Sequence, residues 1–361
     1  EDSTFTPALL MDQADALYEI PDRRAQSVAR YAGLAAKYPK DESAAQALYM
    51  AAFAALELGQ NDEAWKHASA FLAAYDKHPR TSDVLHVAAE AQLQRGDPKD
   101  AEKLYRRLLT EYPDHPDSQL WKIRCALAMQ LQKKNAEAVA LISPVLKDIR
   151  DPALQAEANH SIGRNLLDSG QPDKAVPYLQ AALSGKAPWR RADETWLALA
   201  ESYRRQNQLD KAVEAATRLI RDFPNSLLLD KAHYRLGEYQ SARRDFAAAE
   251  KAYMELVGRW PSSPLASHGL HELGCTQLAL KNPAAAEKTL TTFLEKYSAH
   301  ETAIRAQYVR GLARQQLKKF APAIEDLQAV LAGKPPADLL ADATYVLGLC
   351  QLGLEKNADA A

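Results

Sequence analysis

An alanine returns at a fixed step of 37 residues along almost the whole chain. After Ala64 the series continues at Ala101, Ala138, Ala175, Ala212, Ala249, Ala286, Ala323 and Ala360. A looser copy is centred on Ala25, which lies 39 residues before Ala64. A period of this size is typical of solenoids, in which one supersecondary unit is stacked many times. We call each of these alanines the anchor of its unit.

Other positions keep the same step relative to the anchor. Seven and eight residues after it stand apolar pairs such as Phe71/Leu72 and Val330/Leu331, and together with the residue four after the anchor they form one helical stripe. Because small side chains let two helices approach closely, each unit is predicted to be a hairpin of two antiparallel helices. The residues twelve before the anchor are all small: Ala52, Ala89, Ala126, Gly163, Ala200, Gly237, Gly274, Gly311 and Gly348.

An aromatic residue followed by proline often closes the second helix, as in Tyr112-Pro113, Phe223-Pro224 and Trp260-Pro261. Proline cannot continue a helix, and it disfavours helical geometry in the residue before it. Polar turns such as 59–62 separate the two predicted helices, and their Asn and Asp side chains suit turns and helix starts.

With its Leu-Gly pairs, Leu236-Gly237, Leu273-Gly274 and Leu347-Gly348, this pattern resembles the tetratricopeptide repeat (TPR) family. The resemblance implies an all-α fold, a right-handed superhelical solenoid of about nine antiparallel helix hairpins plus a terminal helix. It implies a single solenoid over residues 1–361, with an atypical repeat at 1–40, eight regular repeats at 41–336 and a half repeat at 337–361. The implied function is a non-catalytic scaffold for protein–protein interaction.

The unit here is 37 residues long, whereas the family norm is 34. Segments 221–226 and 230–238 resemble the variant found in bacterial envelope proteins, namely the lipoprotein of outer-membrane protein assembly and the coordinator associated with the Tol-Pal system. This resemblance implies a periplasmic or outer-membrane-associated bacterial protein. A cytoplasmic location stays open as the alternative.

The tenth unit has only its first helix, which leaves an apolar face uncovered. We therefore expect either that the chain is a fragment of a longer protein or that a partner or second copy covers residues 337–354. Two alternative functions follow: a non-catalytic accessory region of a larger envelope enzyme or secretion machine, and a structural spacer or oligomerisation element.

Composition argues against several other classes. The chain has 45 basic and 47 acidic residues without a cationic stripe, so no nucleic-acid partner is expected. No apolar run approaches the ~18 residues of a membrane span. The three cysteines lie far apart, and neither a zinc-ligand spacing nor a phosphate-binding loop nor a nucleophile elbow is found, so we expect no metal, no cofactor and no enzymatic activity.

The residue fifteen before each anchor is expected to face the concave groove lined by the first helices. Seven of these nine positions hold Tyr or His, the other two being Ile123 and Leu197. We predict that these rings contact a partner peptide, because aromatic side chains give contact area at low entropic cost. The alternative, which is favoured for any single residue, is that a ring fills the wedge between neighbouring helices. The predicted partner-binding rings are Tyr49, His86, His160, Tyr234, His271, Tyr308 and Tyr345.

Arg164 and Arg204 could add a basic stretch midway along this groove, with Glu157 and Glu201 nearby. The alternative is a solvated face with ion pairs worth about 0 to 1 kcal/mol each. A clamp for a C-terminal carboxylate, as in the co-chaperone subgroup, is disfavoured, because the Asn positions that it needs are occupied by Phe53, Glu90, Leu127, Arg164 and Glu201.

Overall fold

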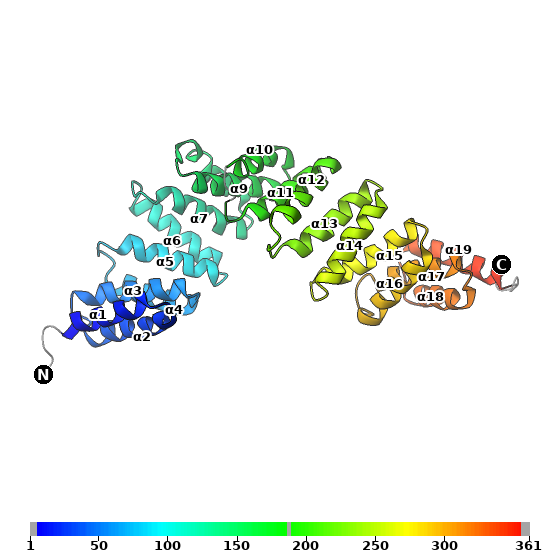
Figure 1. Cartoon of the computed structure of the whole chain (residues 1–361). Coiled ribbons are helices and arrows are strands. Elements are labelled where there is room, and N and C mark those ends of the chain that lie inside the picture. The colour runs from blue at the N-terminus through cyan, green and yellow to red at the C-terminus, as the bar shows by residue number, and fades with distance from the viewer. Residues whose placement is uncertain (1–5, 186–188, 355–361) are drawn as a thin grey trace. The chain divides into compact units, whose positions relative to one another are not determined.

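The computed structural model describes residues 6–185 and 189–354. Throughout these residues the chain is helical and contains no strand, which confirms the all-α prediction. The chain is divided into two compact units, residues 1–190 and 191–361. Each unit is a row of antiparallel helix hairpins, and in Figure 1 the row can be followed helix by helix along the colour bar.

The described residues of the first unit, 6–185 and 189–190, form five hairpins, each made of a first and a second helix in chain order. The helices are α1 (Thr6–Glu19), α2 (Arg24–Lys37), α3 (Ser43–Glu57), α4 (Asn61–Ala74), α5 (Thr81–Gln94), α6 (Pro98–Glu111), α7 (Ser118–Leu131), α8 (Asn135–Ile142), α9 (Pro152–Asp168) and α10 (Pro172–Ala182). Two short 3₁₀ turns, η1 (Pro21–Arg23) and η2 (Leu146–Asp148), lie between them.

In the second unit, the part that the structure describes, residues 191–354, forms four hairpins and one further first helix. The helices are α11 (Ala192–Arg205), α12 (Leu209–Asp222), α13 (Leu229–Ala242), α14 (Phe246–Arg259), α15 (Ala266–Ala279), α16 (Pro283–Lys296), α17 (Ala303–Gln316), α18 (Phe320–Ala332) and α19 (Ala337–Gly353). The regular alternation of first and second helices confirms the prediction of stacked helix hairpins.

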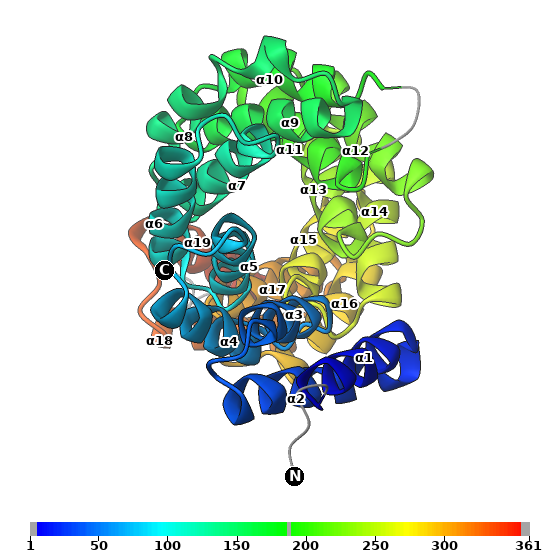
Figure 2. The same cartoon turned by 90° about the vertical axis from the view of Figure 1, so that its left-hand side faces the viewer.

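Within each unit the first helices form one layer and the second helices form the other (Figure 2). Direct packing between first helices, such as α3 with α5 and α15 with α17, holds the first layer together. Every second helix also packs against the first helix of its own hairpin. All anchor alanines from Ala64 to Ala323 are fully buried, as the close approach of the two helices requires.

From the α3–α4 hairpin onward, the turn inside each hairpin repeats one local structure, a left-handed residue five positions before the anchor. Glycine occupies this position at Gly59, Gly96 and Gly170, and the other residues that adopt a positive φ there are Lys133, Asn207, Arg244, Lys281 and Lys318. In every one of these turns the next amide donates to a carbonyl five residues back, for example Gln60 N to Ala55 O at 2.9 Å. This is the Schellman arrangement, which satisfies the last carbonyls of the first helix.

Asp and Asn cap several of the following helices. The side chains of Asp97, Asp245 and Asn282 accept hydrogen bonds from the backbone amides three residues later, at 3.1–3.2 Å. These contacts satisfy amides that have no partner inside the helix, as expected for Asp and Asn at this position.

The aromatic residue before proline ends the second helix as predicted. The amides of Tyr112, Phe223 and Trp260 donate to the carbonyls four residues back at 2.9–3.0 Å, and the helix goes no further. Two repeats depart from the predicted stripe: α10 ends at Ala182 and leaves Leu183 outside the helix, and α8 ends earlier still. Val145 and Leu146 were expected on the second helix, but α8 ends at Ile142, just before Ser143 and Pro144, because Pro144 has no amide hydrogen to donate.

Candidate partner-binding surface

The residues fifteen before the anchor all lie on first helices, and in the first unit their rings are packed against neighbouring side chains. Tyr49 on α3 is half-buried and lies 5.9 Å from the ring of Phe53, with the guanidinium of Arg80 4.9 Å from its ring centre. Burial, followed by the charge of Asp83, raises the pKa of Tyr49. The phenol is therefore neutral and keeps part of its ring accessible.

His86 and His160 are more enclosed. The ring of His86 lies 6.1 Å from Tyr105 and 6.5 Å from Trp121, and burial lowers its pKa. His160 is only 4% exposed, and its ring centre lies 5.1 Å from that of Trp189. In the first unit, these two imidazoles fill space between helices.

In the second unit the series contains two half-buried tyrosines and one exposed tyrosine. Tyr234 on α13 is half-buried, with its ring 6.1 Å from Tyr253 and 6.3 Å from His268. Burial, followed by Glu238 and Glu272, raises its pKa to about 12. Tyr308 on α17 is also half-buried, beside the apolar cluster formed with α18 and α19. Tyr345 on α19 is 69% exposed.

His271 on α15 completes the ring series of the second unit. Its side chain is 12% exposed and its ring lies 6.2 Å from Phe293 of α16. The two non-aromatic members of the series, Ile123 and Leu197, are buried. The tyrosines of the series that keep accessible ring surface are thus Tyr49 in the first unit and Tyr234, Tyr308 and Tyr345 in the second.

The two arginines singled out in the sequence are paired with acids on their own helices. Arg164 contacts Asp168 at 3.1 Å, and Arg204 makes two hydrogen bonds of 2.8 Å to Glu201. Arg205 shares the same carboxylate. Although burial raises the pKa of Glu201, these guanidinium contacts outweigh burial and lower it to about 2. The basic stretch is therefore locally neutralised.

Charged side chains on three first helices form a cluster of ion pairs that the sequence pattern did not predict. Arg124 of α7 lies 3.3 Å from Glu90 of α5 and 2.8 Å from Glu157 of α9, and all three side chains are less than one-fifth exposed. Tyr105 also donates a hydrogen bond to Glu90. One sign of this cluster was present in the sequence. Arg124 lies fourteen residues before its anchor, a position at which the two preceding 37-residue repeats have the apolar residues Met50 and Val87.

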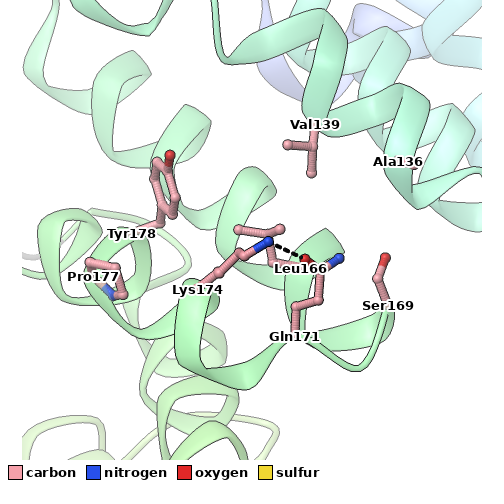
Figure 3. A pocket seen from close by; sticks show the side chains of 8 residues that line it. All are labelled: Ala136, Val139, Leu166, Ser169, Gln171, Lys174, Pro177 and Tyr178. Carbon is pink, nitrogen blue, oxygen red and sulfur yellow. Dashed lines mark hydrogen bonds between the residues drawn. The ribbon is translucent and has the colours of Figure 1, made fainter.

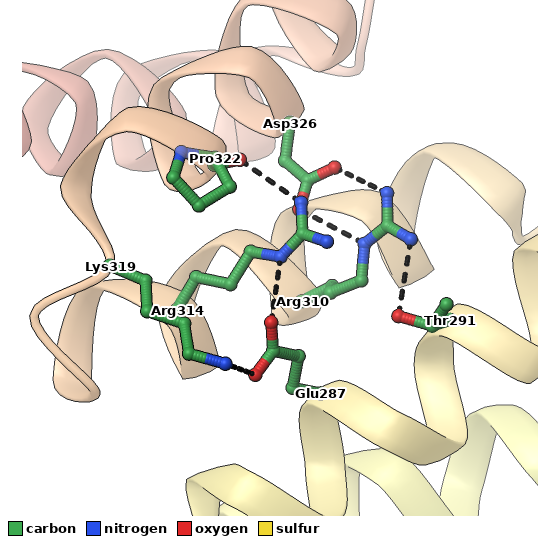
Figure 4. Close-up of polar contacts among 7 residues, drawn as sticks. All are labelled: Glu287, Thr291, Arg310, Arg314, Lys319, Pro322 and Asp326. Atoms are coloured by element: carbon green, nitrogen blue, oxygen red, sulfur yellow. Dashed lines mark hydrogen bonds and ion pairs between the residues drawn. The ribbon is translucent and has the colours of Figure 1, made fainter.

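Another ionic network fixes the second-helix side of the second unit (Figure 4). Arg310 of α17 pairs with both carboxylate oxygens of Asp326 on α18, at 2.6 and 3.0 Å. Arg314 bridges Asp326 at 2.9 Å and Glu287 of α16 at 3.2 Å, and Lys319 contacts Glu287 at 2.6 Å. The Asp326 side chain is only 4% exposed, so the centre of the network is buried. Through the contact between Arg314 and Glu287, the network also links two neighbouring hairpins.

The second-helix side of the first unit carries an open pocket of about 510 Å³ (Figure 3). Its floor is apolar, and its cation, Lys174, is held by Gln171 at 2.9 Å. The lining residues come from α8 to α10: Ala136, Val139, Leu166, Ser169, Gln171, Lys174, Pro177 and Tyr178.

No group of three or more His, Cys, Asp or Glu side chains within 6–185 and 189–354 is arranged to hold a metal ion. In the same part of the chain, no helix combines the length and apolar character that crossing a lipid bilayer requires.

Comparison with known proteins agrees with this architecture. Family models described as tetratricopeptide repeat match residues 55–122, 92–158 and 160–226. Among solved structures, PilW, a widely conserved type IV pilus biogenesis factor, is 16% identical with a TM-score of 0.51, covering 62% of this chain and 97% of its own. The C-terminal part of a TPR repeat-containing protein from Cytophaga hutchinsonii is 17% identical with a TM-score of 0.50, covering 72% and 98%. No curated protein matched the sequence.

Proposed function

Because the chain belongs to the tetratricopeptide repeat family, a fold that typically serves as a non-catalytic scaffold for protein–protein interaction, we propose that its first-helix layer binds a segment of a partner protein. The observation that carries the proposal is the partial exposure of Tyr234, Tyr308 and Tyr345 at one repeated position. A phenol ring offers apolar area together with a polar tip, which suits contact with a peptide.

The layer is formed by packed helices before any partner arrives, so little ordering is needed on binding. Preorganisation of this kind keeps the entropic cost of association low. Charges beside the tyrosines occur in compensated pairs such as Arg235 with Glu238 at 2.6 Å. We therefore expect the partner segment to be recognised mainly through apolar and hydrogen-bonding contacts, with weak dependence on salt.

The test compares the double variant Tyr234→Ala/Tyr308→Ala with the intact chain in affinity capture from the source organism, followed by titration of the captured partner. We expect the double variant to bind at least about tenfold more weakly, which corresponds to about 1.4 kcal/mol. Met254→Ala is the matched control, because Met254 is 54% exposed on the second helix α14. Equal affinities for the double variant and the intact chain, with unchanged circular dichroism, would rule out the first-helix site.

We further propose that this scaffold works in a bacterial cell envelope, in the periplasm or at the outer membrane. The support is the resemblance of segments 221–226 and 230–238 to envelope proteins of this family. Fractionation of the source organism with an antibody against the chain tests the location, and recovery with cytoplasmic markers alone would contradict it.

Self-association is a second candidate, and α19 is the reason to consider it. This helix has an exposed apolar surface, which is formed by Leu340 (46% exposed), Tyr345 (69%) and Leu352 (50%). The earlier first helices bury the corresponding surface more fully. Exposed apolar area of this kind marks contact sites. Analytical sedimentation of the intact chain and of Leu352→Glu tests this. If the chain self-associates through α19, the intact chain sediments as a species larger than a monomer and the Leu352→Glu variant sediments as a monomer.

A further inference from the structure

Cys275, His271 and Glu272 form a connected trio on α15. The Sγ atom of Cys275 lies 3.8 Å from Nε2 of His271, and Nδ1 of the same ring lies 3.1 Å from Oε1 of Glu272. Cysteine and histidine are four residues apart, so the helix places both on one face. Cys275 is partly exposed, and the Glu272 side chain is 39% exposed.

This geometry assigns a role to each nitrogen of the imidazole. When Nδ1 carries its proton and donates to Glu272, Nε2 is free to accept the thiol proton of Cys275. A thiol with an adjacent imidazole that is itself oriented by a carboxylate is the arrangement that activates sulfur as a nucleophile. Although burial lowers the pKa of His271, its contacts with Cys275 and Glu272 outweigh burial and raise it to about 10, so the imidazolium formed when the thiol proton moves to Nε2 is stabilised beside the thiolate.

The helices packed around the trio do not compete for these contacts. On α16 the ring of Phe293 faces His271 edge-on at 6.2 Å. On α13 and α14 the titratable neighbours are Tyr234 and Tyr253, whose pKa values are raised by burial and by carboxylates including Glu272, so both phenols stay neutral.

The other two cysteines provide a contrast within the same chain. Cys125 and Cys350 are fully buried, and burial raises the pKa of both thiols, that of Cys125 to about 12. Buried thiols in apolar surroundings are inert because the reactive thiolate is disfavoured and the reagent cannot reach it. Only Cys275 among the three combines access with a neighbouring base.

We propose that Cys275 is a reactive thiol that undergoes thiol–disulfide exchange, with His271 as its base and Glu272 as the residue that orients His271. In this step the thiol proton passes to Nε2 of His271, and the thiolate attacks one sulfur of an incoming disulfide. A mixed disulfide forms on Cys275, and the other sulfur leaves as a thiolate that takes the proton back. Because Cys275 lies one turn from His271 on the first-helix layer, the attached group would occupy the edge of the proposed partner surface.

The test follows the reaction of the intact folded chain with dithiodipyridine through the absorbance of the released thiopyridone. We expect one equivalent of thiopyridone per chain to be released rapidly. This rapid release should be lost in Cys275→Ser and kept in the double variant Cys125→Ser/Cys350→Ser. His271→Asn should slow the reaction about tenfold near pH 7 and shift its half-maximal pH upward, and Glu272→Gln should produce a smaller shift in the same direction.

Either of two outcomes overturns the proposal. One is a His271→Asn variant in which the rate and pH profile of the reaction are the same as in the intact chain. The other is a Cys275→Ser variant that still releases one equivalent of thiopyridone rapidly. Circular dichroism of each variant shows that the fold is kept. If His271→Asn fails to fold, Glu272→Gln still decides, because a merely structural contact would leave its pH profile unchanged. Loss of partner binding in the tyrosine double variant is a separate measurement, so the two proposals can fail independently.

Discussion

Gly237 on α13 and Tyr253 on α14 are in such close contact that a β-carbon on the glycine would lie 2.5 Å from Cε1 of the tyrosine. Tyr253 stands four residues after its anchor and is fully buried, so its ring has little room to move. The same relationship recurs between Gly274 and Leu290, where a β-carbon would lie 2.5 Å from Cγ. The small residue twelve before the anchor is therefore a steric requirement of the hairpin.

Replacing Gly237 by leucine should overpack this contact. We expect the free energy of unfolding to fall by about 1 to 3 kcal/mol, as measured by urea denaturation. Gly258→Ala on α14 is the matched control, because open space surrounds that position and alanine should stabilise the helix by about 0.5 to 1 kcal/mol. A Gly237→Leu variant as stable as the parent would show that the helices can separate without cost.

The left-handed turn position gives a prediction of opposite sign at two equivalent sites. Arg244 is exposed and has a φ of 63°, whereas the corresponding Gly170 has a φ of 72°. Because a side chain costs about 1 to 2 kcal/mol in this region, Arg244→Gly should be neutral to stabilising by up to about 1 kcal/mol, and Gly170→Ala should be destabilising by about 1 kcal/mol. Thermal midpoints of the two variants decide this; equal shifts would contradict it.

Removing the carboxylate of Asp326 should destabilise the second unit strongly. Its loss leaves the guanidinium groups of Arg310 and Arg314, which are about one-sixth exposed, without their shared partner. We expect Asp326→Ala to cost about 3 to 5 kcal/mol in urea denaturation. Asp222→Ala, which breaks an exposed pair with Arg221, should cost no more than about 1 kcal/mol. Similar losses for the two variants would mean that burial does not set the strength of the network.

Glu102 predicts a dependence of stability on acid pH. Burial raises the pKa of its carboxyl, but hydrogen bonds from Lys134, Arg106 and Gln132 outweigh burial and lower it from 4.5 to about 2. A folded-state pKa below the unfolded value stabilises the fold above about pH 4.5, and this contribution is lost as the pH falls toward 2. Glu102→Gln should therefore be less stable than the parent at pH 7, and the difference should shrink in that window.

Urea midpoints of the parent and of Glu102→Gln, measured from pH 7 down through the acid range, check this expectation. Glu295→Gln is the control, because Glu295 is exposed and should follow the parent at every pH. A gap between parent and Glu102→Gln that stays constant on acidification would show that the charge of Glu102 is not involved.

The sequence by itself determined the hairpins, the positions of the turns and the buried anchors. These features depend on local chemistry: an alanine such as Ala249 at the helix contact, a left-handed residue five positions earlier, and proline after an aromatic residue at the end of the second helix. Each acts within one 37-residue unit, so a repeated pattern reveals it. Pro144 shows the limit of the pattern, since a single residue shortened α8 inside an otherwise regular repeat.

Only the tertiary structure decided which rings are accessible and which charges meet. His160 and Tyr345 occupy the same repeat position, yet one is 4% and the other 69% exposed, because Trp189 covers the first ring and no described residue encloses the second to that extent. Arg314 and Glu287 likewise meet across two neighbouring hairpins. Exposure and ion pairing depend on side chains brought together from neighbouring units, and a periodic pattern carries no information about those partners.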